Sequence, residues 1–411
     1  MNASAATPAV PRSAALYLGM VQFFFATTWT LYVIYLPQLA KQAGIDLAWV
    51  PWILVADQII MAVMDVVTGF WADRVRSGLA TMGMWILGLS VISCAAFVAL
   101  PFIATAAGTN ASLLVLAILV WTLTSSALRS PPWALLSRYA AAPALPWMST
   151  LVLSGTAIAA ALAPYLGVAL RDIDPRVPFV LSTLTLLATV GGLIFVERHL
   201  ARSSPVPAAA GDPPFDLKIP GAKRQVSLFF IALLLMAAAF QVHFSLNSAH
   251  QYLRFAENGE LQFLMPVFWI GFNLLMFPMA GFVKRYGTFR VMAIGAAAGS
   301  GASLATALAP DLNTLITMQF IAGGCWGAVN VAAFTAAITF GRANREGAFL
   351  GMLFATLALA AFIRIGAYAS DIAQQPVFDV ILPWIPAGGW LLGAVLLWTV
   401  RAVWQKPTEM A

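Results

Sequence analysis

The sequence contains few charged residues. Asp, Glu, Lys and Arg together make up 9% of the 411 residues, whereas hydrophobic residues make up 61%. A water-soluble chain carries about a quarter charged residues, because its surface faces water. So few charges exclude a soluble globular protein of this length. They favour an integral membrane protein whose helices cross about 30 Å of hydrocarbon.

Cysteine and catalytic motifs are scarce as well. The two cysteines, Cys94 and Cys325, both fall inside apolar runs, so a disulfide framework is not expected. No spacing typical of metal ligands, no phosphate-binding loop and no nucleophile motif is present. These absences argue against a metal site, a cofactor and an enzyme, including an ATP-driven pump. The net charge of +6 is spread over short loops, without the basic cluster typical of nucleic-acid binding.

What the sequence does contain is a series of apolar runs, each long enough for a transmembrane helix. We predict twelve spans, at residues 16–39, 48–71, 79–102, 112–136, 148–170, 177–196, 226–252, 261–283, 288–308, 312–340, 348–370 and 380–404. The one long connection, Glu197 to Gln225, is rich in Pro, Ala and Gly, which is typical of a linker. We therefore predict an all-α membrane protein with two six-helix bundles, residues 1–197 and 226–411, joined by a cytoplasmic linker at residues 198–225.

Basic loop residues predict the orientation. With the N-terminus inside, only Lys41, Arg171, Arg176 and Arg254 fall on the outer side. The other loop arginines and lysines fall on the inner side: Arg12, Arg74, Arg76, Arg138, Arg198, Arg202, Lys218, Lys223, Arg224, Lys284, Arg285, Arg290, Arg342, Arg345, Arg401 and Lys406. An even number of spans then places both termini in the cytoplasm. We expect a monomer in a plasma membrane, the inner membrane of a bacterium.

Two short basic turns occupy corresponding places in the predicted halves. The first, at residues 69–76, follows the second span and reads Gly-Phe-Trp-Ala-Asp-Arg-Val-Arg. The second, at residues 280–287, follows the eighth span and reads Ala-Gly-Phe-Val-Lys-Arg-Tyr-Gly, with Lys284 at the place of Asp73. Corresponding features in two halves are typical of transporters that arose by duplication.

Together with the span count and the linker, these turns resemble the pattern Gly-x-x-Ala-Asp-Arg-x-Gly-Arg of the major facilitator superfamily. Gly69, Ala72, Asp73 and Arg74 match the pattern, and Arg76 replaces its later glycine. The resemblance implies two pseudo-symmetric six-helix halves and transport by alternating access. It also implies a gating turn at the cytoplasmic face, made by Gly69, Asp73, Arg74, Arg285 and Gly287.

A narrower resemblance is to the glycoside–pentoside–hexuronide cation symporters, the branch of the melibiose permease. Their second helix carries Asp-Pro-x-x-Gly and their fourth ends in Pro-Tyr-x-Ala-Leu. Here residues 65–69 read Asp-Val-Val-Thr-Gly, and residues 131–136 read Pro-Pro-Trp-Ala-Leu-Leu. Met61 stands where those symporters have a second aspartate, and the fourth span has Arg129 in place of an acid. A proton is therefore favoured as the coupling ion, with sodium as the alternative.

Charged residues inside the spans each need a partner or a function, because a charge in hydrocarbon costs a few kcal/mol. Asp57 and Asp65 lie in the second span, Arg129 in the fourth and Arg364 in the eleventh. The resemblance implies that helices two and eleven meet across the halves, which would let Asp65 approach Arg364. We hypothesise that such an ion pair breaks and reforms to couple a proton to alternating access. The alternative is a permanent pair that only fixes packing.

Polar and aromatic side chains recur at helical spacing on five predicted spans. They are Gln22 and Trp29 in the first, Trp121 and Ser125 in the fourth, His243 and Asn247 in the seventh, Trp269 and Asn273 in the eighth, and Gln319, Trp326 and Asn330 in the tenth. Lipid is a poor environment for amides and imidazoles. The resemblance implies that helices one, four, seven and ten line the substrate cavity. Hydrogen bonding between packed helices is the alternative.

Three functions remain open. The first is proton-coupled uptake of a small polar solute. The glycoside-symporter resemblance favours a sugar, whereas the two intramembrane arginines favour a carboxylate, which guanidinium binds with two parallel hydrogen bonds. The second is proton-driven export of amphipathic compounds, favoured by the many aromatic and Met side chains. The third is a transporter-like sensor or assembly factor. In each case the bilayer is a partner, and no nucleic acid is expected.

Overall fold

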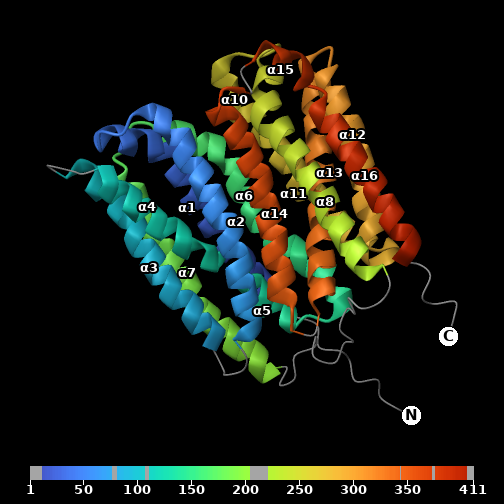
Figure 1. The fold of residues 1–411 in the computed structure, drawn as a ribbon, viewed down its shortest axis with the longest axis horizontal. Helices are drawn as coiled ribbons and strands as arrows, with labels where there is room; N and C mark the ends of the chain where they lie inside the picture. Colours follow the sequence, from blue (N-terminus) through green and yellow to red (C-terminus); the bar gives the residue numbers. More distant parts are fainter. Residues whose placement is uncertain are drawn as a thin grey trace.

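The computed structural model describes residues 12–75, 81–106, 111–203, 221–342, 344–372 and 375–404, and helices are the regular elements of this part of the chain. A helix satisfies its backbone hydrogen bonds within one segment, which hydrocarbon requires. The predicted all-α class is confirmed. Figure 1 shows the helices side by side, with the earlier ones on the left and the later ones on the right.

The N-terminal part of the chain forms the left-hand helices of Figure 1. They are α1 Arg12–Gln42, η1 Leu47–Trp49, α2 Val50–Arg74, α3 Thr81–Thr105, α4 Ala111–Ser125, η2 Ser126–Leu128, α5 Pro131–Arg138, η3 Ala142–Ala144, α6 Leu145–Ala169 and α7 Arg176–Ser203.

The C-terminal part forms the right-hand helices. They are α8 Ala222–Gln241, η5 Val242–Asn247, α9 Ser248–Tyr252, η6 Asn258–Glu260, α10 Leu261–Leu264, α11 Pro266–Tyr286, α12 Thr288–Ala307, α13 Leu312–Gly341, α14 Glu346–Ala369, α15 Pro376–Ile381 and α16 Ile385–Trp404. Most of the predicted linker at residues 198–225 lies outside the described residues. The division into two domains at that point stays a prediction.

The sequence predicts twelve crossings, and the described chain can be compared with that number. Ten helical segments of the described chain are long and apolar enough to cross a membrane. Two further helices pack beside them, α12 against α13 and α16 against α8. The described chain therefore supplies twelve long helical segments.

Several of the predicted spans are not continuous α-helices, and the breaks in the fourth and the seventh lie beside predicted site residues. In the fourth, α4 and η2 end before Arg129, and α5 begins at Pro131. Pro131 and Pro132 lack backbone N–H groups, so they fit the first turn of a helix and not its middle. In the seventh, α8 passes into the π-helix η5 before α9 begins. Breaks of these kinds change the direction of side chains and often accompany functional sites.

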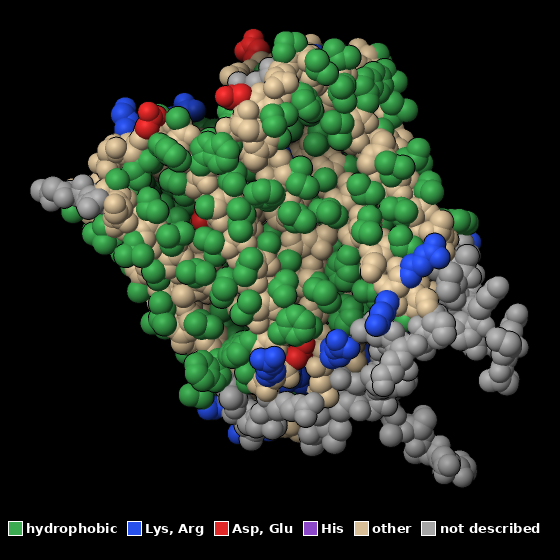
Figure 2. All heavy atoms as spheres, in the orientation of Figure 1, with side chains coloured by type: hydrophobic (Ala, Val, Ile, Leu, Met, Phe, Trp, Pro, Cys, Tyr) green, Lys and Arg blue, Asp and Glu red, His purple; other side chains and the backbone are tan. Residues whose placement is uncertain are grey.

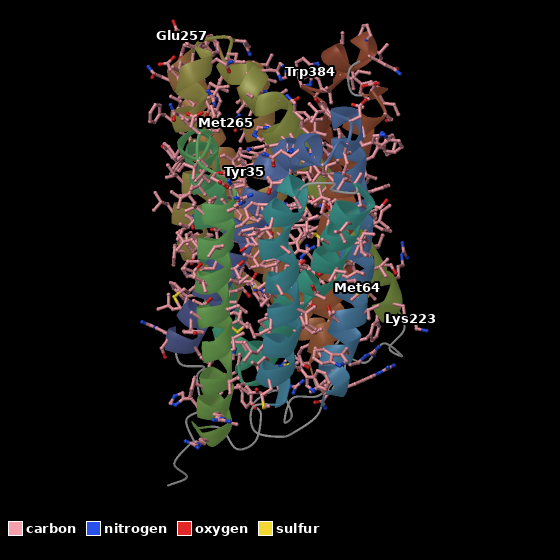
Figure 3. All side chains as sticks on the ribbon, turned by 90° about the vertical axis from the view of Figure 1, so that its left-hand side faces the viewer. Tyr35, Met64, Lys223, Glu257, Met265 and Trp384 are labelled. Carbon is pink, nitrogen blue, oxygen red and sulfur yellow. The ribbon has the colours of Figure 1, made fainter. Side chains whose placement is uncertain are left out.

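The two ends of the bundle differ in charge. Figure 2 shows a broad hydrophobic surface and, along its lower edge, a row of Lys and Arg side chains. We call this edge the basic end; it holds the last turns of α2, α5 and α11 and the first turn of α14. Glu257 and Trp384 lie at the opposite end, and Lys223 lies toward the basic end (Figure 3).

The contact between α2 and α14 joins the two sets of helices. The two helices run antiparallel, and their backbones meet at Gly69, Gly347 and Gly351. A Cβ atom at Gly69 would overlap the carbonyl oxygen of Gly347, and one at Gly351 would overlap that of Asp65. No side chain separates the helices here, so Asp65 lies directly at the junction of the two sets.

Candidate functional site

Asp65 is the most buried of the predicted charges, with no exposed side-chain surface. Its partner is Arg129, whose Nη1 lies 3.1 Å from Asp65 Oδ2. The break between η2 and α5 places Arg129 beside α2, and its guanidinium lies over the ring of Phe354 on α14, 5.3 Å from the ring centre. The ion pair therefore belongs to the N-terminal helices but contacts the C-terminal ones.

The hypothesis that Asp65 pairs with Arg364 is wrong for this structure. Asp65 is level with Gly351 on α14, and Arg364 follows Gly351 by 13 residues. At about 1.5 Å and 100° per residue, this places Arg364 about 20 Å along the helix and about 140° around it. Helices two and eleven do meet, but their register separates the two charges.

Arg364 instead lies against α8. Its Nε donates a hydrogen bond to Oε1 of Gln241 at 3.0 Å. Within the described residues, no carboxylate lies within 4.0 Å of its guanidinium. Arg364 is half-buried, so the structure holds a cation near the apolar part of the bundle without an anion beside it.

Asp57, two turns before Asp65 on α2, is also buried and is held by hydroxyl groups. Tyr32 on α1 donates to Oδ2 at 2.7 Å, and Thr122 on α4 donates to Oδ1 at 2.7 Å. Both carboxylate oxygens are therefore satisfied by neutral donors from two other helices. The site lies in a core of aromatic rings and is separate from the Asp65–Arg129 pair.

The predicted polar stripe of the seventh and tenth spans forms one buried network. His243 Nε2 lies 3.0 Å from Gln319 Oε1, and Gln319 Nε2 donates to Ser248 Oγ at 3.0 Å and to Gln251 Oε1 at 3.2 Å. Asn247 donates to the carbonyl of Leu382 at 2.7 Å. The alternative of interhelical hydrogen bonding thus describes these residues in the present conformation.

The predicted N-terminal stripe is aromatic and packs inward. Trp29 stacks on Trp121 at 5.6 Å, and Trp121 also contacts Tyr32. Gln22 donates to the carbonyl of Leu128 at the helix break, at 2.8 Å, and Ser125 donates to its own helix. Gln22 thereby satisfies a carbonyl that the break leaves without a helical partner.

The remaining predicted cavity residues make local contacts. Asn273 and Asn330 each donate to a carbonyl four residues earlier, those of Trp269 and Trp326. Trp326 is buried and stacks on Phe240 at 4.7 Å, while Trp269 is half-buried among phenylalanines. Whether these side chains line a substrate cavity stays a prediction.

The predicted gating turn contacts the other set of helices through Asp73. Its Oδ1 accepts a hydrogen bond from the backbone N–H of Gly347 at 2.7 Å, and its Oδ2 accepts one from Ala348 at 2.8 Å. These N–H groups begin α14 and have no partner within the helix, so a carboxylate is favourable there. Arg74, one residue later, is exposed.

The second turn does not repeat this contact. Arg285 is exposed and lies over the ring of Tyr286, and Gly287 ends α11 with φ +84°, a conformation that favours glycine. In the described residues, no hydrogen bond or ion pair joins Arg74, Arg285 or Gly287 to the opposite set of helices. The reason is chemical, because Lys284 cannot accept hydrogen bonds from a helix N-terminus.

Comparison with known proteins identifies the family. Residues 18–364 match the profile of the Major Facilitator Superfamily. The chain belongs to this superfamily. It is therefore a multi-pass membrane protein of a transporter family, as the turns and span count predicted. No curated protein matches the sequence, and nothing in the comparisons supports the narrower glycoside-symporter resemblance.

Solved structures of other major facilitators share this fold. The human organic anion transporter MFSD10 has a TM-score of 0.71 at 14% identity, over 94% of this chain and 99% of that one. A bacterial homologue of the iron transporter ferroportin, in an outward-facing state, has 0.72 at 13%, over 95% and 99%. The Escherichia coli fucose:proton symporter has 0.67 at 14%, over 96% and 99%. At these identities the likeness concerns the fold alone.

The basic end of this major facilitator also holds charges that sequence patterns did not single out. Arg342, after α13, donates from both Nη atoms to the carbonyl of Ala140 at 3.2 and 3.3 Å, which joins the two sets of helices a second time. Burial lowers the pKa of Arg342. Glu346, at the start of α14, is buried near Arg138 and Arg342. Their position in a short charged turn, residues 342–346, between two long apolar runs was the available signal.

Glu197 is a further buried acid that the sequence reading assigned to the linker boundary. It accepts hydrogen bonds from the backbone N–H groups of Met82 and Gly83, at 3.3 and 2.8 Å, and so holds the start of α3 against α7. Among the described residues, no group of three or more His, Cys, Asp or Glu side chains could hold a metal ion.

Three cavities of this major facilitator are lined mainly by residues that were not predicted as site residues, although Gly287 lines the first of them. One of about 380 Å³ separates Pro143 and Pro146 from Lys284 and Thr288 at the basic end. One of about 520 Å³ lies between α11, α12 and α13, and one of about 480 Å³ lies near Arg171 at the opposite end.

Proposed function

We propose that this major facilitator is a secondary active transporter that moves a small polar organic solute by alternating access, coupled to a proton. The observation that carries the proposal is the Asp65–Arg129 ion pair. Asp65 is fully buried, and the guanidinium of Arg129 contacts Phe354 of the other set of helices. A buried charge pair is expensive to maintain for packing alone. Because the pair lies at the junction of the two sets of helices, a change in its charge can alter how the two sets pack together.

The proposed coupling begins with a proton on a carboxylate oxygen of Asp65. Protonation removes the negative charge and with it the attraction to Arg129, 3.1 Å away. The guanidinium of Arg129 is then free to move relative to Phe354. The charge on Asp65, whose backbone contacts Gly351 of α14, is removed at the same time. One titratable group suffices for this step. A sodium site would need several oxygen ligands, so sodium is the second choice.

The closed basic end supports alternating access. Asp73 binds the start of α14, Arg342 binds Ala140, and Trp133 of α5 stacks on Phe334 of α13 at 4.3 Å. Solute entering from the opposite end would be stopped here. We further propose that the basic end is cytoplasmic, following the distribution of basic residues, and that the protein resides in a bacterial inner membrane.

The test is uptake into proteoliposomes with an imposed pH or sodium gradient, using panels of sugars, glycosides and carboxylates. We expect accumulation to follow an inward proton gradient in the wild type. D65N should lose gradient-driven accumulation but keep exchange of solute between the two sides. D46N, at the exposed cap of η1, is the matched control and should transport normally. Gradient-driven accumulation by D65N would refute the coupling assignment.

The same assay decides among the alternatives. Aromatic side chains of the C-terminal helices form a continuous group, in which Phe240 contacts Phe244, Phe268, Trp269 and Trp326, and this favours amphipathic compounds as a second class. Accumulation against the proton gradient would indicate their export. Movement of no solute by intact protein would favour a sensor or assembly factor.

A further inference from the structure

Arg364 has hydrogen-bond donors that no acceptor in the described structure occupies. Its Nε is occupied by Gln241, but neither terminal Nη atom has a hydrogen-bond partner among the described residues, and both keep solvent-accessible surface. The Nε2 amide group of Gln241 is likewise without a partner and accessible. Three nitrogen donors of one guanidinium and one amide therefore lie together with nothing accepting from them.

The contrast with Arg129 shows why this matters. Both arginines lie inside predicted spans, but Arg129 is neutralised by Asp65. Arg364 has no carboxylate within 4.0 Å among the described residues. An unpaired guanidinium at membrane depth is costly unless an anion or water compensates it. Within the described residues no side chain supplies such an anion, which leaves a ligand as a candidate partner.

The local geometry also argues against a surface role. Arg364 lies five residues before the end of α14, about 8 Å from it. A long side chain at this depth usually extends to the membrane surface. Here the hydrogen bond to Gln241 holds the guanidinium against α8, with its Nη pair unoccupied. In this arrangement the two Nη atoms of the guanidinium are available to a ligand.

We propose that Arg364 and Gln241 form the anion-binding part of the substrate site and that the transported solute carries a carboxylate. The Nη pair would bind both carboxylate oxygens in parallel, and the Gln241 amide would donate to a further oxygen of the solute. This inference rests on the proposed transport function and chooses between the sugar and carboxylate classes left open there. It reverses the sequence-based roles, because Arg129 serves the internal pair and Arg364 the ligand.

The register of α2 and α14 supports this assignment. Arg364 lies toward the opposite end of the bundle, about 20 Å along α14 from Gly351 and the contact that closes the basic end. In the present conformation the anion site is therefore on the side away from the closure formed by Asp73. A solute would meet Arg364 first and the Asp65 pair afterwards.

The test uses the full chain in lipid nanodiscs and two matched sets of probes. The first set is acetate, succinate, benzoate and glucuronate; the second is the uncharged amide of each. Binding is followed by titration calorimetry and by the shift in unfolding temperature. We expect at least one carboxylate to bind and its amide to fail, because only the carboxylate compensates the guanidinium.

Variants assign the binding to this site. R364Q should weaken the bound carboxylate on the order of tenfold or more, and R364K should weaken it less, since it keeps the charge but not the fork. Q241E would place a carboxylate beside Arg364, so it should abolish binding while raising the unfolding temperature of the ligand-free protein. R171Q, an exposed arginine at the same end, should bind as the wild type does.

The outcomes separate the two proposals. Equal binding of carboxylates and amides, no binding of any carboxylate, or wild-type binding by R364Q or Q241E would overturn the anion site. Carboxylate binding that R364Q removes, without any solute movement in liposomes, would keep the site and refute the transport function. Proton-driven uptake of neutral sugars, unaffected by R364Q, would keep transport and refute the site.

Discussion

The carboxylate of Asp73 binds the backbone N–H of Gly347, although 274 positions separate them in the sequence. With the neighbouring bond to Ala348, this contact ties the last turn of α2 to the first turn of α14. One negative charge at a helix N-terminus is therefore among the contacts that close the basic end.

We predict that D73N opens the basic end. The amide keeps the shape but loses the charge, so the closed form should lose about 1–2 kcal/mol, which changes the ratio of closed to open roughly 5- to 30-fold. The measurement is maleimide labelling of S137C, a position buried at this end, with Cys94 and Cys325 replaced by alanine. D311N removes a comparable cap from α13 and should leave labelling unchanged. Unchanged labelling in D73N would contradict the role of the charge.

Glycine at position 351 should be required for closure. G351A would place a Cβ atom on the carbonyl oxygen of Asp65, so α2 and α14 must separate, at about 1–3 kcal/mol. Labelling of S137C should rise accordingly. G366A is the matched control on the same helix, because nothing lies within 4 Å of its added methyl group; it should leave labelling unchanged and raise the unfolding temperature slightly. Similar behaviour of the two variants would rule out the contact as the cause.

The hydroxyl groups of Tyr32 and Thr122, which donate to Asp57, should each contribute to the free energy of unfolding. Y32F or T122V leaves one buried oxygen of Asp57 without its donor, which costs about 1–3 kcal/mol of unfolding free energy. In a D57N background the same changes should matter less, and a double-mutant cycle of unfolding temperatures measures the difference. T27V, whose hydroxyl binds only its own helix, is the control. Additive effects would show that the groups do not interact.

A pH dependence is expected from Asp311, which caps α13. Hydrogen bonds from the backbone N–H of Thr314 lower the pKa of Asp311 below its usual value. A carboxyl group with a lowered pKa stabilises the folded state above its unfolded pKa of about 3.9, and this contribution disappears as the pH falls through the folded pKa. The difference in unfolding temperature between wild type and D311N should therefore be constant near pH 7 and shrink below about pH 4. A difference that grows on acidification would have the wrong sign.

The fold could be predicted because hydropathy and loop charge act locally. A run of apolar residues crosses the membrane whatever its neighbours are, so the spans and their class followed from the sequence. The resemblance implied that Asp73 belongs to a gating turn, but it did not show that the carboxylate would accept hydrogen bonds from the first turn of α14. The break at Arg129 was signalled by Pro131 and Pro132 but was read as part of one span.

The partners of the buried charges could not be predicted, because they depend on how each helix is rotated and shifted along its neighbour. In this structure the register of α2 and α14 leaves Arg364 about 20 Å along α14 from Asp65, while the break before α5 places Arg129 beside it. Similarly, the spacing of His243 and Asn247 placed them on one face of the seventh span, and Gln319 was placed on a face of the tenth. It did not show that Gln319 would contact His243, Ser248 and Gln251, or that Asn247 would donate to the carbonyl of Leu382.

The contact at Gly69, Gly347 and Gly351 constrains how this sequence can diverge. Any descendant that shuts its basic end in the same way has to retain glycine at all three places, since even alanine would collide with the facing main chain. Gly366 and Gly388 have open space around them and are free to drift. Distant relatives that keep these three glycines would therefore be expected to close the same end through the same helix contact, even where they transport different solutes.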